Sequence, residues 1–189
     1  MNTSNLIVEF LVIGFGAMLS LILMSGIIIN PEQIFLFFKT IELQYVILLL
    51  PITYVIGILA ERLSASILKP KKIEQKIFPN GSALFCRTTV YLKSQSLKEL
   101  TEINRSLRSI CRAYFLNFIL LIISLNTFIF LNKQFVADKL KFIENPTLFQ
   151  VAVSFFLAIL SLYCVKTYRK LTLQEYKMLK EQSHILLNQ

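Results

Sequence analysis

Four long apolar segments alternate with charged segments along the chain. They cover residues 6–29, 43–60, 113–131 and 148–165, with lengths of 24, 18, 19 and 18 residues. A helix needs about 20 predominantly apolar residues to cross the hydrocarbon core of a bilayer. Each segment is therefore long enough to span a membrane, and the sequence predicts an all-α protein built as a four-helix transmembrane bundle.

The third and fourth spans are predicted to extend beyond the bilayer as amphipathic helices. Apolar residues recur at helical spacing before the third span, while arginines occupy another face. No Asp, Glu, Lys or Arg then follows Arg112 until Lys133. We therefore expect one helix over 97–131 that begins in water and ends across the membrane. The fourth span shows the reverse order, because its apolar segment leads into an amphipathic pattern over 166–187.

These patterns divide the chain into four parts. They are a transmembrane hairpin over 1–62, a basic cytosolic segment over 63–112, a second transmembrane hairpin over 113–165, and a cytosolic C-terminal helix over 166–189. Residues 63–96 are too few to bury a core of their own, so we expect them to pack on the helical extensions or on a partner. Within them, residues 84–92 are compatible with either a strand or a short helix.

Lys and Arg are concentrated on one predicted side of the membrane. Residues 61–112 hold eleven of the twenty, and residues 166–189 hold five. Because Lys and Arg are retained on the cytoplasmic face, these segments and both termini are predicted to be cytoplasmic. The net charge of +9 follows largely from this topology. It does not indicate direct nucleic-acid binding, since no aromatic residues are interleaved with the basic ones as single-strand binders require.

Ionisable residues gather near the predicted cytoplasmic boundary of the spans. They are Glu9, Glu61, Arg62, Arg112 and Lys166. Such residues are functional candidates by default, and we expect ion pairs among them, with Arg112 or Lys166 as the partner of Glu9. The alternatives are a packing role and transport chemistry. A carboxylate in the first of four spans is similar to that of small multidrug transporters, although theirs lies deeper in the helix.

A second basic set lies in the predicted cytosolic segment. It comprises Lys69, Lys71, Lys72, Lys76, Arg105, Arg108 and Arg112. Each Lys or Arg close to an acidic leaflet adds about 1 kcal/mol of attraction. These residues either enforce orientation alone, bind anionic lipid headgroups, or bind an acidic protein or a nucleotide.

Polar residues follow one side of the third and fourth spans. They are Asn117, Ser124, Gln150, Ser154 and Ser161. Side chains of this kind commonly hold membrane helices together, and pore lining is the alternative. Because no span carries a charged ring at mid-depth, a selective ion channel is disfavoured.

The residues that usually perform catalysis or bind metals are missing from the sequence. There is no nucleophile–histidine–acid trio, no phosphate-binding loop and no pair of carboxylates within a span, and His184 is the single histidine. Cys86, Cys111 and Cys164 lack the spacing of metal ligands. The sequence therefore predicts a protein that is not an enzyme and that needs no metal or other cofactor.

The architecture resembles the small four-span membrane proteins of bacterial antiphage defence systems. The resemblance lies in span count, chain length and basic helical extensions such as residues 105–112, RSLRSICR. It implies a membrane component that works with a separate soluble protein. A bias toward Ile, Lys, Asn and Phe is also typical of AT-rich bacterial genomes, so the expected location is the bacterial inner membrane.

These features lead to one main hypothesis and two alternatives. The main hypothesis is an oligomeric inner-membrane protein that contacts membrane lipids and couples a cytosolic protein partner to the bilayer, by recruitment or by changing permeability. The alternatives are a small proton-coupled transporter or exporter, and a passive membrane anchor or assembly subunit.

Overall fold

The computed structural model describes residues 3–28, 31–40, 43–79, 83–139 and 145–187. Apart from short connections such as residues 68–70 and 78–79, the chain is helical in these ranges and forms no strand, which confirms the predicted all-α class. The helices are α1 (Thr3–Ile28), α2 (Pro31–Thr40), α3 (Leu43–Ile67), α4 (Lys71–Ile77), α5 (Ala83–Lys93), α6 (Gln95–Leu131), α7 (Lys133–Lys139) and α8 (Pro146–Leu187).

Among the described helices, α1, α3, α6 and α8 are long and apolar enough to cross a membrane. Many of their large apolar side chains point outward, including Phe15 with 63% of its surface exposed and Phe155 with 68%. Water disfavours so much exposed hydrocarbon, whereas lipid tails can cover it. The helices therefore indicate a multi-pass membrane protein.

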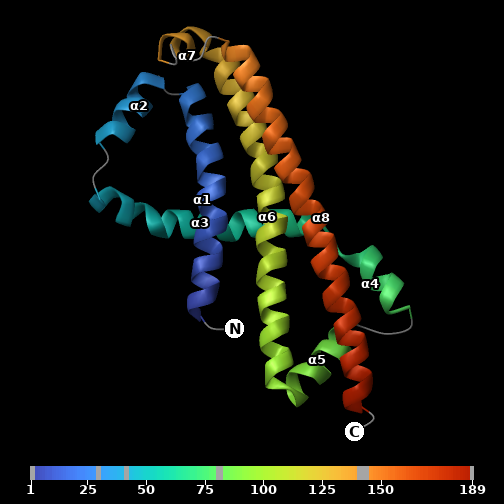
Figure 1. Ribbon diagram of the computed structural model, residues 1–189. Coiled ribbons are helices and arrows are strands. Elements are labelled where there is room, and N and C mark those ends of the chain that lie inside the picture. Colours follow the sequence, from blue (N-terminus) through green and yellow to red (C-terminus); the bar gives the residue numbers. More distant parts are fainter. Residues whose placement is uncertain (1–2, 29–30, 41–42, 80–82, 140–144, 188–189) are drawn as a thin grey trace.

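The two longest helices run without interruption from charged into apolar sequence, or the reverse. Helix α6 has 37 residues and α8 has 42. Figure 1 shows them side by side near α7 and further apart toward their other ends, where α5 lies between them. Near α7, Asn126 of α6 donates to Ser154 Oγ at 2.9 Å and accepts from Gln150 Nε2 at 2.6 Å. These hydrogen bonds join the apolar halves of α6 and α8, residues 113–131 and 148–165.

Helix α3 departs from the predicted four-helix bundle. Helices α1, α6 and α8 lie roughly along one direction, whereas α3 crosses α1 and α6 steeply (Figure 1). The crossing lies at Gly14 of α1 and Gly57 of α3. A Cβ at Gly14 would overlap the carbonyl oxygen of Thr53, and one at Gly57 would overlap that of Phe10. Because only glycine permits so close a backbone approach, this pair fixes where α3 crosses.

Helices α4 and α5 pack against the charged half of α8, residues 166–187. Val90 of α5 and Leu179 of α8 are fully buried in their shared core. The rings of Phe78 and Tyr176 meet edge to face, 5.8 Å apart. The stretch that the sequence left open between strand and helix belongs to helix α5. We call α4, α5 and the charged halves of α6 (95–112) and α8 the charged module.

Replacing Gly14 by Ala should destabilise the protein by about 3 kcal/mol, the upper range for overpacking. Alanine favours a helix more than glycine does, so a loss of stability would come from the contact with α3. The measurement is the unfolding temperature in detergent. Gly16→Ala is the comparison and should have a smaller effect, because a Cβ there would meet side-chain atoms of Asn117 and Tyr114 rather than a backbone carbonyl. Equal effects of the two changes would argue against the described crossing.

Candidate functional site

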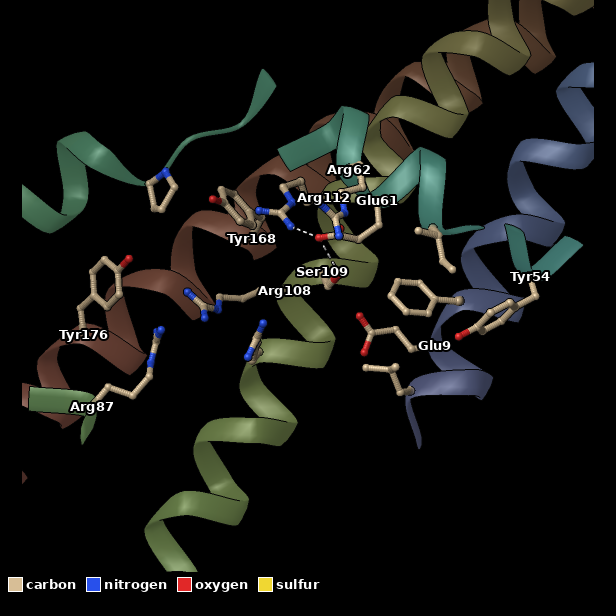
Figure 2. A pocket seen from close by; sticks show the side chains of 15 residues that line it. Glu9, Tyr54, Glu61, Arg62, Arg87, Arg108, Ser109, Arg112, Tyr168 and Tyr176 are labelled. Carbon is tan, nitrogen blue, oxygen red and sulfur yellow. Dashed lines mark hydrogen bonds and ion pairs between the residues drawn. The ribbon is translucent and has the colours of Figure 1, made fainter. Parts of the chain in front are cut away.

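A cavity of about 850 Å³ lies where the charged module meets α1 and α3. Figure 2 shows Arg87, Arg108 and Tyr176 on one side of it, with Glu9 and Tyr54 on the opposite side. Volumes of this size are typical of sites for small molecules. The cavity also lies where α6 changes from charged to apolar sequence, because Arg112, the last charged residue before the apolar half, lines it.

Arginines dominate the lining of this cavity. The five are Arg62 of α3, Arg87 of α5, and Arg105, Arg108 and Arg112 of α6. The three on α6 are spaced three and four residues apart, so they share one face of the helix. Glu9 and Glu61 are the two carboxylates among the lining residues. The cavity is therefore strongly basic.

Glu175 of α8 lies behind two of these arginines and is fully buried. Arg87 Nη2 donates to its Oε1 at 2.8 Å, and Arg108 Nη2 forms an ion pair with its Oε2 at 2.6 Å. A carboxylate away from water is strongly destabilised unless cations neutralise it. This requirement holds α5, α6 and α8 together at one point.

A second carboxylate links α3 to α6. Arg112 donates to Glu61 Oε1, and Ser109 Oγ donates to the same oxygen at 3.3 Å (Figure 2). Glu61 and Arg112 were both expected at the cytoplasmic boundary, and the structure brings these two residues into direct contact. Arg62, also in that set, lines the same cavity.

Glu9 has a different partner from the one that the sequence suggested. Its side chain is buried, with 6% of the residue exposed, and its Oε2 accepts a hydrogen bond from Ser106 Oγ at 2.6 Å. The expected ion pair with Arg112 or Lys166 is not among the described contacts. The reason is positional, since Arg112 pairs with Glu61 and Lys166 is exposed on α8. Glu9 therefore links α1 to α6 through a hydroxyl group.

Several arginine nitrogens in the cavity have no acceptor. The Nε atoms of Arg87, Arg108 and Arg112 are buried without a hydrogen-bond partner among the described atoms. A buried donor left unpaired costs about 1–3 kcal/mol. Within the described structure, Arg62 and Arg105 also make no ion pair. An anion with several oxygens would supply the missing acceptors, because guanidinium groups bind carboxylates and phosphates in this way.

Aromatic residues complete the walls. Phe10 and Tyr54 meet edge to face at 5.7 Å on the side formed by α1 and α3. On the other side, the guanidinium of Arg108 lies 6.0 Å from the centre of the Tyr176 ring. Burial, then the charge of Glu74, raises the pKa of Tyr176, while nearby arginines oppose the shift. The phenol therefore stays neutral near pH 7 and adds no negative charge to the cavity.

The described lysines of the predicted cluster lie outside this cavity. Lys69, Lys71 and Lys76 are exposed and do not line it, and the side chain of Lys72 is outside the described part of the chain. The three arginines of α6 in the predicted basic set do line the cavity.

The predicted polar stripe lies in helix contacts. Asn117 donates to the carbonyl oxygen of Ile13 at 2.9 Å, joining α6 to α1. Ser124 and Ser161 are buried, while Gln150 and Ser154 form the bonds with Asn126 described above. Three of these residues thus make hydrogen bonds between helices, and both the packing role and pore lining stay predictions.

Sequence reasoning missed Arg87, Glu175 and Tyr176. A signal existed for Glu175, because it lies seven residues after Tyr168 and four before Leu179, on the buried side of α8. A charged residue on an apolar helical stripe needs a cation nearby. Which cation it meets depends on how α5 folds back, and helical periodicity does not contain that information.

The described residues contain no group of three or more His, Cys, Asp or Glu side chains placed to hold a metal ion. Comparison of the chain with protein-family models, curated proteins and solved structures finds no match.

Replacing Glu175 by Ala should lower the free energy of unfolding by about 3 kcal/mol, because it leaves two arginines without their shared counter-charge. Glu181→Ala is the matched control, since Glu181 is an exposed carboxylate on the same helix. The unfolding temperature of both variants in detergent provides the measurement. A loss no larger than that of the control would show that the buried ion pairs do not hold the three helices together.

Proposed function

We propose that this chain is a non-enzymatic component of the bacterial inner membrane that couples a cytosolic helical module to its membrane helices. The charged module is the proposed cytosolic part, and the apolar halves of α6 and α8 are proposed to lie in the bilayer. The observation that best supports this proposal is the set of polar links around the arginine cavity. They connect α1, α3, α5 and α8 to α6 through three carboxylates.

The mechanism follows from helix continuity and from competition for the arginines. A protein or ligand that draws Arg87 or Arg108 away from Glu175 loosens the contact between α5, α6 and α8. Because α6 and α8 are unbroken, a change in their separation at the charged ends reaches the apolar ends directly. Packed interfaces of this kind switch between discrete arrangements. The proposed output is a change in membrane permeability.

The charged module also has an exposed apolar stripe that a partner would cover. Leu100, Ile103 and Leu107 of α6 lie at helical spacing and are all exposed, as are Leu84 and Phe85 of the neighbouring α5. Exposed apolar residues at such spacing are typical of helix docking surfaces. The stripe supports a docking role for the module toward a second copy of the chain or a soluble protein.

Permeability provides the functional test. Glu175→Gln and Arg87→Gln should depolarise cells that express them, relative to wild type, because the links that hold the resting arrangement are broken. Membrane potential is measured with a potential-sensitive dye at matched levels of extractable, folded protein, and Glu181→Gln is the control. An unchanged potential in both cavity variants would contradict the coupling proposal and favour a passive anchor.

The second candidate is proton-coupled transport, and one observation favours it. Glu9 is buried in the cavity wall and bonded to a hydroxyl rather than to a cation. Glu9→Gln should then abolish substrate movement in membrane vesicles, whereas Glu61→Gln should retain it. If Glu9 only packs against Ser106, the Gln variant will transport normally and the transporter candidate fails.

A further inference from the structure

The arginine cavity has two chemically different sides. Leu6 and Phe10 of α1, with Tyr54 and Ile58 of α3, form a mainly aliphatic and aromatic side, which also contains Glu9. Arg87 and Arg108 lie on the side opposite Tyr54 (Figure 2). A ligand that fills such a cavity needs an anionic part and an apolar part.

The anionic part is defined by the charges that the protein leaves unbalanced. Five arginines line the cavity, whereas Glu9 and Glu61 line it and Glu175 lies behind it. The excess is therefore two positive charges. Three buried Nε–H groups also lack acceptors among the described residues. A phosphate group carries several acceptor oxygens and suits guanidinium forks, so the chemistry points to a phosphate ester.

The two helices of the apolar side also carry large hydrophobic side chains outside the cavity. Ile7 of α1 and Val55 and Leu59 of α3 are exposed, and each lies about 100° around its helix from the adjacent lining residue. A lipid has acyl chains that can contact apolar lining residues such as Phe10 and Ile58, whereas a small water-soluble phosphate ester has no apolar part to do so. The cavity also lies at the change from charged to apolar sequence in α6, the depth at which lipid headgroups are found.

From these observations we infer that the cavity binds an acidic phospholipid, with its phosphate among the arginines and its acyl chains along α1 and α3. The inference rests on the membrane location in the proposed function but not on coupling. A bound phosphate competes with Glu175 and Glu61 for the same guanidinium groups. Lipid composition would therefore regulate how firmly the charged module is held.

The test uses the full chain purified in a neutral detergent with equal amounts of phosphatidylglycerol and phosphatidylcholine. Native mass spectrometry then measures which lipid stays bound. The key variant is Arg62→Gln with Arg105→Gln, because both side chains are exposed at the cavity and make no described ion pair, so the links of Glu61 and Glu175 remain. Arg169→Gln is the control, an exposed arginine of α8 that does not line the cavity.

Wild type and the control should prefer phosphatidylglycerol by about tenfold, and the double variant should lose most of this preference. Equal retention of the two lipids by wild type, or an unchanged preference in the double variant, overturns the inference. The single variants repeat the test if the double variant does not fold. Glycerol 3-phosphate is added as a soluble competitor, and displacement of lipid at comparable concentration would overturn the choice of a lipid.

This measurement is independent of the coupling proposal. It uses purified protein without a partner and without a permeability readout. If the wild-type protein showed no lipid preference, depolarisation by the Glu175 and Arg87 variants would still support coupling. If those variants caused no depolarisation, a lipid preference would still support lipid binding in the cavity.

Discussion

The charged module depends on one physical constraint, the neutralisation of a carboxylate that has no access to water. Glu175 is fully buried, and its two oxygens engage arginines from two other helices. Ion pairs of this kind add little stability compared with apolar packing, but breaking one is costly. Their effect is on specificity, because an arrangement that separates Glu175 from Arg87 and Arg108 leaves a buried charge without a partner.

The position of the cavity follows from the two environments, lipid and water, to which the apolar and charged halves of α6 and α8 are suited. In their apolar halves, α6 and α8 lie close together, joined by the hydrogen bonds of Asn126, as expected where lipid supplies no hydrophobic drive for association. In their charged halves they separate, and α5 inserts its apolar side between them (Figure 1). The cavity lies at the point of separation, where α3 crosses and contributes Glu61.

The sequence predicts the four long helices of this fold well, but it does not predict the short helices α2, α4 and α7 or the arrangement of the long ones. Helix lengths and the continuity of α6 and α8 follow from local periodicity, which a sequence records directly. The steep crossing of α3 does not, because it depends on two glycines 43 residues apart, Gly14 and Gly57, whose contact has no local signature. The same limit applies to the site. The sequence predicts that Glu9 and Arg112 lie near the cytoplasmic boundary of the spans. It does not predict their partners, because these depend on which face of α6 meets α1 and α3.

The burial of the arginines separates two explanations for their presence. Orientation in a membrane requires only that basic residues stay on the cytoplasmic side, and exposed lysines such as Lys69 and Lys71 meet that requirement without any packing. Arg108 and Arg112 are different, because their side chains are only 11% and 17% exposed. Holding a guanidinium away from water costs free energy that exposed lysines do not incur. The unpaired Nε–H groups of these partly buried arginines, together with the two further arginines at the cavity, therefore favour a role for this cavity in binding an anion, beyond setting the topology of the chain.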